Sequence, residues 1–344
     1  MCPNLVIRAD AGPEIGTGHV MRCLALAEPW QKGGSRVVLA SSKLLPALRQ
    51  RGQSTGIGLQ SVASAPGSPA DAKELAQMAA EQKADWVVVD GYHFDADYQR
   101  ALKEAGLRLL FFDDFGHTKN YCADFVLNQN LGANESLYKN RASGTQLLLG
   151  TRFVQLRGEF LEWRDWRRTI PPRAKKILVT LGGSDSQNVT FKAVQAIRQI
   201  TGLKCETTIV IGASNPQGEI LKSIMQNSPA IRVLQNADNM PELMAEADLA
   251  IAAGGTTAWE LAFMGLPALM IVLAENQRSN AEQLQSAGVA RNLGWHNKLS
   301  PEKIAGEIAR LTGDFSVRSE MSKRGRELVD GRGSERIMSC LQNA

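Results

Sequence analysis

The chain has 344 residues, of which 44% are hydrophobic and 22% charged, a composition that excludes a largely disordered, collagen-like or coiled-coil protein. The length predicts two domains, each able to bury a core. A formal net charge of +4, from 39 Lys and Arg against 35 Asp and Glu, is too small to indicate a nucleic-acid partner and leaves room for a small anionic ligand.

Short β-branched runs alternate with longer amphipathic stretches in the first half of the chain. We predict strands over residues 5–8, 36–40, 86–90, 107–112 and 125–127. We predict helices over residues 18–32, 44–52, 71–82 and 96–106. Strands that alternate with helices in this way indicate a parallel sheet covered on both faces.

The second half repeats this layout without a residue-level repeat. Strands are predicted over residues 176–181, 207–211, 231–234, 249–252 and 268–271, and helices over residues 188–200, 216–226, 239–246, 257–264, 276–287 and 300–311. The predicted fold class is therefore α/β, with two Rossmann-like, doubly wound domains at residues 1–156 and 176–315. We expect ligand at the carboxyl ends of the strands, in the crevice between these domains.

A linker and a C-terminal helix complete the layout. Residues 157–175 include Trp163, Trp166 and the pair Pro171–Pro172, which is typical of a solvated connecting segment. The alternative is a basic-aromatic patch that touches a membrane or a phosphate. A basic helix is predicted over residues 316–344, broken by Gly331 and Gly333, and its position would let it pack back across the domains.

The cysteines are scattered and odd in number. They are Cys2, Cys23, Cys122, Cys205 and Cys340. This pattern predicts reduced thiols and a cytoplasmic protein, with neither a disulfide framework nor a zinc site. The sequence contains no run of the ~18 apolar residues that a membrane span needs, so we expect no stable membrane insertion.

A glycine-rich turn follows the first predicted strand and leads into a helix. Asp10, Gly16, Gly18, His19 and Arg22 lie in or beside this turn. Glycines let the backbone approach a ligand closely, and the N–H groups at a helix start favour an anion. The same positive end disfavours imidazolium, so we expect His19 to be neutral near pH 7 and able to accept a proton. The alternative is a capping turn with a structural histidine.

Two glycine pairs follow predicted strands in the second half. Gly182–Gly183 precedes Ser184, and Gly254–Gly255 precedes Thr256–Thr257. The same N–H groups serve either helix capping or a diphosphate cradle. Glu260, three residues after Thr257, either completes a capping box or accepts hydrogen bonds from two sugar hydroxyls.

Weaker candidates lie at other strand ends. Tyr92–His93 and Asn276–Gln277 each follow a predicted strand and would face the ligand edge. Asp95-x-Asp97 formally matches the metal-binding D-x-D of some glycosyltransferases, but its place at a predicted helix start favours N-capping. No His, Cys or Asp cluster has metal-ligand spacing, so we expect neither a metal nor a cofactor.

Several blocks carry a family resemblance. They are Arg8-Ala-Asp-Ala, Ile15-Gly-x-Gly-His19-Val-Met-Arg22-Cys-Leu, Asp113-Asp114, Val126-Leu-Asn128-Gln-Asn130, Leu181-Gly-Gly-Ser-Asp and Gly254-Gly-Thr-Thr-x-Trp-Glu260 through Asn276-Gln277. Together they resemble the PseG family, the UDP-2,4-diacetamido-2,4,6-trideoxy-β-L-altropyranose hydrolases of pseudaminic acid biosynthesis. The block ending at Glu260 is shared with MurG-type glycosyltransferases, so it identifies the fold more than the reaction.

The resemblance implies a GT-B architecture, in which two domains face a cleft. The C-terminal domain would bind UDP through Gly182, Gly183, Ser184, Gly254, Gly255, Thr256, Thr257 and, on the ribose, Glu260. The N-terminal domain would bind the amino sugar, with His19 as the catalytic base. Substrate contacts would come from Asp10, Gly16, Gly18, Arg22, Tyr92, Asn276 and Gln277.

The reaction implied by the resemblance breaks the sugar C1–O bond with inversion and releases UDP and the free sugar. A base that takes the proton of a water contributes roughly 10²–10⁴-fold. Only the UDP-amino sugar and water are then needed as partners, and we expect a monomer. The alternatives are a glycosyltransferase with a sugar hydroxyl as acceptor, a non-catalytic nucleotide-sugar binder and a UDP-sugar 2-epimerase.

Overall fold

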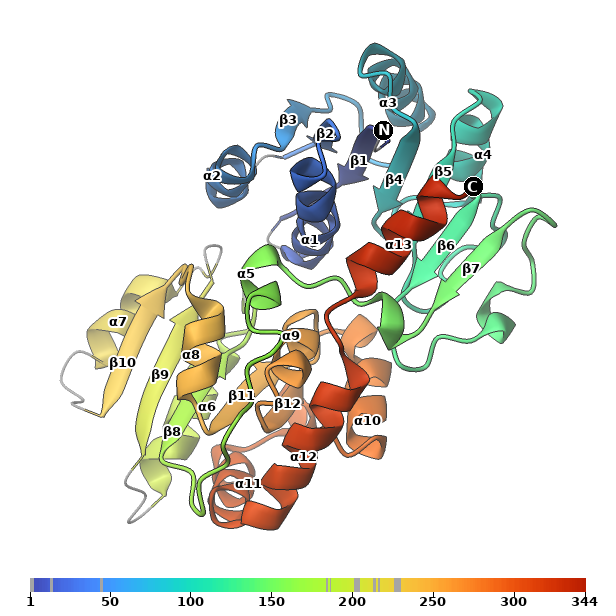
Figure 1. The fold of residues 1–344 in the computed structure, drawn as a ribbon. Helices are drawn as coiled ribbons and strands as arrows, with labels where there is room; N and C mark the ends of the chain where they lie inside the picture. Colours follow the sequence, from blue (N-terminus) through green and yellow to red (C-terminus); the bar gives the residue numbers. More distant parts are fainter. Residues whose placement is uncertain are drawn as a thin grey trace. The chain divides into compact units, whose positions relative to one another are not determined.

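The computed structural model describes residues 3–12, 15–43, 46–183, 185, 187–200, 205–212, 215, 217–225 and 230–344. The chain divides into two compact units: unit 1 comprises residues 1–158 and 331–344, and unit 2 comprises residues 159–330. Each unit is built on one parallel sheet (Figure 1). Within the described ranges, no helix is long and apolar enough to cross a membrane.

Unit 1 contains a seven-stranded sheet in the order β3-β2-β1-β4-β5-β6-β7. All of its strand pairs are parallel. The strands are β1 (Leu5–Ala9), β2 (Val37–Ser41), β3 (Gly58–Ser61), β4 (Trp86–Asp90), β5 (Leu109–Phe112), β6 (Phe125–Asn128) and β7 (Gln146–Leu149). The strand order reverses between β1 and β4, and this switch point is where doubly wound sheets bind ligands.

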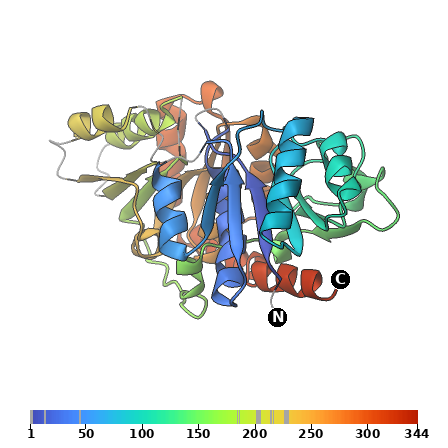
Figure 2. The same ribbon diagram turned by 90° about the horizontal axis from the view of Figure 1, so that it is seen from above.

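Helices cover both faces of this sheet. They are α1 (Gly18–Lys32), α2 (Pro46–Thr55), α3 (Pro69–Glu81), α4 (Ala96–Glu104) and α13 (Gly333–Gln342), with short 3-10 turns at Glu135–Tyr138 and Thr151–Phe153. Apolar side chains of α1 and α13 pack on one face, around Ile7 and Val88. Those of α3 and α4 pack on the other, around Val6 and Val87 (Figure 2).

Unit 1 is completed by the last residues of the chain. The Trp86 indole N–H donates to the Leu341 carbonyl at 3.1 Å, and Ile337 is fully buried in the core beside α1. Gly333 lets this helix come close, because a Cβ there would lie 2.0 Å from the Val154 carbonyl oxygen. The predicted helix over residues 316–344 is therefore two helices, α12 (Phe315–Leu328) in unit 2 and α13 in unit 1.

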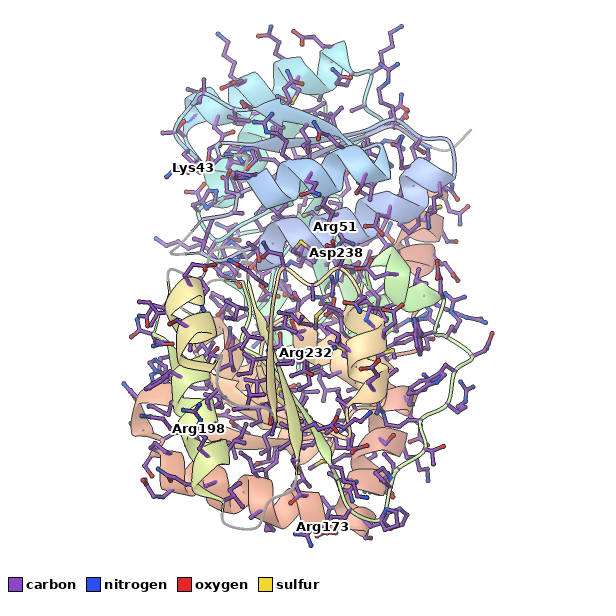
Figure 3. The ribbon with its side chains drawn as sticks, turned by 90° about the vertical axis from the view of Figure 1, so that its left-hand side faces the viewer. Lys43, Arg51, Arg173, Arg198, Arg232 and Asp238 are labelled. Atoms are coloured by element: carbon purple, nitrogen blue, oxygen red, sulfur yellow. The ribbon has the colours of Figure 1, made fainter. Side chains whose placement is uncertain are left out.

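Unit 2 contains a six-stranded parallel sheet in the order β10-β9-β8-β11-β12-β13. Its strands are β8 (Lys176–Thr180), β9 (Glu206–Ile211), β10 (Ile231–Gln235), β11 (Leu249–Ala253), β12 (Ala268–Val272) and β13 (Ala290–Trp295). The switch point lies between β8 and β11. Arg232, labelled in Figure 3, lies exposed on the edge strand β10, where a charge discourages pairing with another chain.

The helices of unit 2 alternate with its strands. They are α6 (Val189–Gln199), α7 (Gly218–Met225), α8 (Met240–Glu246), α9 (Thr257–Phe263), α10 (Arg278–Ser286), α11 (Pro301–Gly313) and α12, with 3-10 turns at Glu275–Gln277 and His296–Lys298. Buried residues of α6 and α11, such as Val194 and Ile308, pack with Ile177 of β8 and Leu269 of β12.

The linker contains only one short helix, α5 (Gly158–Leu161). Its basic residues bind the protein's own carbonyls: the Arg168 guanidinium donates to the Met264 carbonyl at 3.1 Å and to carbonyls at the end of α8. Arginines at helix C-termini stabilise the negative end of the helix. Arg168 is therefore part of the packing of unit 2. This role weakens the interpretation of the segment as a patch that touches a membrane or a phosphate.

The Asp95-x-Asp97 pattern caps a helix, as predicted. Asp95 is the N-cap of α4, and its carboxylate accepts hydrogen bonds from the backbone N–H groups of Asp97 and Tyr98, both at 3.0 Å. A carboxylate in this position satisfies N–H groups that have no partner within the helix.

Candidate functional site

His19 lies at the switch point of unit 1, at the start of α1 and beside the carboxyl end of β4. Its Nδ1 is 2.6 Å from Oδ1 of Asp90, the last residue of β4. Because an ionised carboxylate can only accept, this contact favours the neutral tautomer that carries its proton on Nδ1 and its lone pair on Nε2. Nε2 makes no hydrogen bond with any residue that the structure describes, so this nitrogen is available to accept a proton.

Arg22 locks the carboxylate that orients His19. Its Nε donates to Asp90 Oδ2 at 2.6 Å and its Nη2 donates to Asp90 Oδ1 at 2.7 Å, a bidentate pair. Its Nη1 donates to Asp114 Oδ1 at 2.7 Å. The Arg22 guanidinium is buried against these two carboxylates, one turn along the helix from His19. The expected contact of Arg22 with substrate stays a prediction.

Tyr92 is held by the second carboxylate. Its hydroxyl donates to Asp114 Oδ2 at 2.6 Å, and Asn130 Nδ2 donates to Asp114 Oδ1 at 3.0 Å. The Tyr92 ring meets His19 edge to face, with 4.8 Å between ring centroids. The structure therefore brings Tyr92 and His19 together. A contact of both residues with the substrate, as the resemblance implies, stays a prediction.

The cluster has one more negative than positive charge when His19 is neutral, because two carboxylates face one guanidinium. Burial by itself would raise the pKa of Asp90, but Arg22 and His19 hold it well below its ordinary value. The pKa of Asp114 is also lowered, against its burial, mainly by Arg22. Both carboxylates are thus ionised, and a proton transferred to His19 would neutralise the cluster.

The other residues of the first glycine-rich turn lie nearby. Asp10 accepts from the Ser42 backbone N–H at 2.7 Å and pairs with Arg8 at 2.7 Å, so it joins β1 to the end of β2. Gly16 has a φ of +72°, which favours glycine whatever the ligand. A Cβ on Gly18 would meet nothing within 4 Å, and the same holds for Gly16, so packing against described residues requires a glycine at neither position.

A second carboxylate–histidine pair lies beside this cluster but has a different role. His117 Nδ1 is 2.8 Å from Asp113 Oδ2, and its Nε2 is 3.1 Å from the Phe94 carbonyl oxygen. Both ring nitrogens face acceptors, and the Asp113 contact raises the pKa of His117 although burial opposes it. Both ring nitrogens of His117 are thus turned toward acceptors of the protein itself, which indicates a structural role.

Asp113 should make the stability of the protein sensitive to acid. Burial opposes ionisation, but His117, Tyr121 and backbone N–H groups lower the pKa of Asp113 from 3.8 to about 2. A carboxylate with a lowered pKa stabilises the fold above its unfolded pKa and loses that effect as the pH falls toward its folded pKa, here by about 2 kcal/mol. The stability difference between wild type and Asp113→Asn, measured by urea unfolding, should shrink between pH 5 and pH 2.5. A difference independent of pH would contradict this role.

The glycine loops of unit 2 flank its switch point, as expected for a phosphate cradle. Gly182, with a φ of +88°, follows β8, and a Cβ on Gly212 would lie 2.3 Å from the Gly183 carbonyl oxygen. Gly254 follows β11 and touches Gln277, whose carbonyl oxygen would be 3.1 Å from a Cβ on that glycine. Ser184 lies outside the described residues.

The threonines and Glu260 lie at the start of α9. Thr256 is the N-cap residue, so Thr257 is already inside the helix. The Thr256 side chain makes no capping hydrogen bond. A capping box between Thr257 and Glu260 requires the helix to begin one residue later than it does. Glu260 is buried, with 8% of its surface exposed. The start of the helix thus places Thr256, not Thr257, at the N-cap position, and both roles expected of Glu260 stay predictions.

Asn276 and Gln277 lie in the turn after β12. Gln277 Oε1 accepts from the Leu273 backbone N–H at 3.1 Å, and Asn280 Nδ2 donates to the Gly254 carbonyl at 2.8 Å. This turn is thus attached to the Gly254–Gly255 loop within unit 2. Across the described part of the chain, no group of three or more His, Cys, Asp and Glu is arranged to hold a metal ion.

Sequence reasoning assigned no role to Asp90 or Asp114, which the structure places beside His19 and Arg22. The signal available was their position, since each ends or directly follows a buried strand near the first strand. What the sequence does not give is the strand order, which places β4 beside β1 and so brings Asp90 to His19.

The chain is similar in sequence to one family model and to proteins of polysaccharide and nucleotide-sugar metabolism. Residues 177–332 match the family model described as the glycosyltransferase family 28 C-terminal domain. The spore coat polysaccharide biosynthesis protein SpsG of Bacillus subtilis (strain 168) is 26% identical to the chain, over 98% of the chain and 97% of the relative. The UDP-2,4-diacetamido-2,4,6-trideoxy-beta-L-altropyranose hydrolase of Campylobacter jejuni is 24% identical, over 83% of the chain and 97% of the relative.

Solved structures establish the fold class. The crystal structure of Acinetobacter baumannii MurG aligns with a TM-score of 0.67 at 18% identity, covering 99% of this chain and all of that one. This likeness, with the two doubly wound parallel sheets, confirms the predicted GT-B fold.

Proposed function

We propose that the protein is an enzyme that acts on nucleotide sugars. More specifically, we propose that it hydrolyses the C1–O bond of UDP-2,4-diacetamido-2,4,6-trideoxy-β-L-altropyranose with inversion, releasing UDP and the free sugar. The observation that carries this proposal is the His19–Asp90 pair, in which Nδ1 lies 2.6 Å from Asp90 Oδ1, an arrangement that would leave Nε2 of the neutral imidazole as the proton acceptor. The Campylobacter jejuni relative is named for the same reaction.

In this mechanism, the base comes from unit 1 and the residues proposed to bind UDP come from unit 2. His19 Nε2 takes a proton from water as the water oxygen forms a bond to C1 on the face opposite UDP. The C1–O bond breaks, and its electron pair leaves with the UDP oxygen. Asp90 keeps the imidazolium oriented and balances its charge. UDP is a stable anion, so one base is enough where glycosidases use two carboxylates.

The leaving group would be held by backbone N–H groups of the loops at Gly182–Gly183 and Gly254–Gly255, which follow β8 and β11. Such groups, pointed at a diphosphate, stabilise the charge that develops as the bond breaks. Glu260 would accept hydrogen bonds from the ribose hydroxyls. The match of residues 177–332 to a glycosyltransferase domain supports nucleotide binding by this unit.

Glu260→Ala should weaken UDP binding about 10- to 100-fold, because two hydrogen bonds to a charged group are lost. Isothermal titration calorimetry with UDP gives the Kd. The Kd of Glu260→Gln should lie between that of wild type and that of Glu260→Ala. Gly255→Ala is a second probe, because a Cβ there would meet only Gln277 Nε2, at 3.7 Å, so the variant should fold and still hinder a phosphate. An unchanged Kd for Glu260→Ala would assign this residue to packing alone.

Activity should survive a molar excess of EDTA, because the proposed mechanism assigns charge stabilisation to backbone N–H groups rather than to a cation. The initial rate of UDP release before and after chelation, and after dialysis into chelated buffer, checks this. A rate that collapses with EDTA and returns with Mg²⁺ or Mn²⁺ would overturn the proposed mechanism.

A glycosyltransferase is the second candidate function, favoured by the family 28 domain match. The two functions differ in the acceptor. Incubation of the protein with the UDP-diacetamido sugar, and without any sugar or lipid acceptor, should release UDP and free sugar at a steady rate. Release that begins only when an acceptor is added would instead support the transferase.

A further inference from the structure

Phe115 is one of the few large apolar side chains that the structure exposes. It lies in the turn after β5, and 47% of its surface is exposed. The turn holds it firmly: Asp113 Oδ1 accepts from the Phe115 N–H at 2.7 Å and also from the Gly116 N–H. Gly116, at a φ of +78°, supplies the conformation that this turn requires. The backbone of Phe115 is thus held in a defined turn while its ring is exposed, an arrangement that suits contact with an apolar group of a ligand.

Aromatic contacts link Phe115 to the candidate base. The Phe115 and Tyr92 ring centroids are 5.2 Å apart, and those of Tyr92 and His19 are 4.8 Å apart. Asp113 holds the backbone of Phe115, and Asp114 holds the Tyr92 ring through its hydroxyl. A row of three rings thus runs from the base to an exposed apolar end, all within unit 1.

We infer that Phe115 is a specificity-determining residue that contacts the methyl-bearing part of the sugar. This inference rests on the proposed function. A 2,4-diacetamido-2,4,6-trideoxy sugar carries methyl groups on both acetamido substituents and at C5, where common hexoses carry hydroxyls. Methyl groups gain free energy by leaving water for an aromatic surface. A hydroxyl in the same place loses its water partners without a replacement.

Phe115→Ala should therefore lower selectivity rather than abolish catalysis. The ratio of kcat/KM for the UDP-diacetamido-trideoxy sugar to that for UDP-N-acetylglucosamine should fall about tenfold, the scale of one apolar contact in a binding pocket. Phe115→Leu should keep part of the ratio. The matched control is Phe315→Ala in unit 2, a phenylalanine with 49% of its surface exposed, which should leave the ratio unchanged.

A binding measurement separates this inference from the proposed reaction. Saturation-transfer NMR on the free diacetamido-trideoxy sugar with UDP present involves no turnover, and its methyl protons should receive strong saturation from wild type and little from Phe115→Ala. Suppose that the variant loses methyl saturation and that wild type releases no UDP. This result would support the contact of Phe115 with the sugar methyl groups, here called the methyl subsite, and would overturn the proposed hydrolysis. If wild type releases UDP, and Phe115→Ala has the same selectivity and methyl saturation as wild type, the methyl subsite is overturned and the proposed hydrolysis is supported. Absence of both signals in wild type would overturn both.

Discussion

His19→Ala is expected to lower kcat for UDP-sugar hydrolysis by about 10²–10⁴-fold, the usual contribution of a general base. The Kd for UDP should not change, because the residues proposed to bind UDP lie in unit 2. The reason is structural: the Asp90 carboxylate, 2.6 Å from Nδ1, leaves Nε2 as the proton acceptor. Steady-state release of UDP gives kcat, and calorimetry gives the Kd.

His296→Ala is the matched control for this variant. His296 lies in unit 2, and its backbone carbonyl accepts a hydrogen bond from Lys192 Nζ at 2.7 Å. The substitution should therefore leave kcat near wild type. If His19→Ala also retained kcat within a few-fold of wild type, His19 would be a structural residue at the start of α1, and the proposed base would be wrong.

Asp90→Asn is expected to have a similar effect on kcat, about 10²–10⁴-fold, by a different route. An asparagine amide donates where the carboxylate accepts, so the proton of His19 would move to Nε2 and the base would be lost. The KM should change much less than kcat, because Asp90 is fully buried and acts through His19. A kcat that falls while KM stays constant is the result that distinguishes a positioning role.

The same substitution should also destabilise the protein. It leaves the buried Arg22 guanidinium without one of its two carboxylates, and breaking such a pair costs about 3–5 kcal/mol. Asp95→Asn is the matched control, because asparagine also caps helices well and Asp95 lies exposed at the start of α4. If Asp90→Asn lost stability but kept its kcat, Asp90 would support the fold alone.

The sequence predicted the central strands well and the edge strands poorly. Strands β1, β4, β11 and β12 are buried along their whole length, so each reads as a continuous apolar run. The strands that we failed to predict, β3, β7 and β13, all lie at sheet edges. Edge strands bury only part of their surface, as in Gly58–Ser61, which has no fully buried residue. A partly buried strand lacks the continuous apolar run by which the central strands were predicted.

The candidate site was predictable only in part for a related reason. A glycine-rich turn before a helix is local, so His19 and the Gly254–Gly255 loop could be found from spacing. The partners of His19 come from afar: Asp90 is 71 residues away, and Asp114 is 92 residues from Arg22. No local pattern encodes which strands are neighbours. The ion pairs of Arg22 with Asp90 and Asp114 could therefore not be predicted from the sequence.

The most direct test of the account is hydrolysis of the UDP-diacetamido sugar by wild type in water enriched in ¹⁸O, without acceptor, followed by mass spectrometry of the released UDP. The account predicts unlabelled UDP together with free sugar, because water attacks C1 and the bridging oxygen leaves with the nucleotide. UDP that carries ¹⁸O would show attack at phosphorus, and UDP that is not released at all would show that water is not the acceptor; either result contradicts the account.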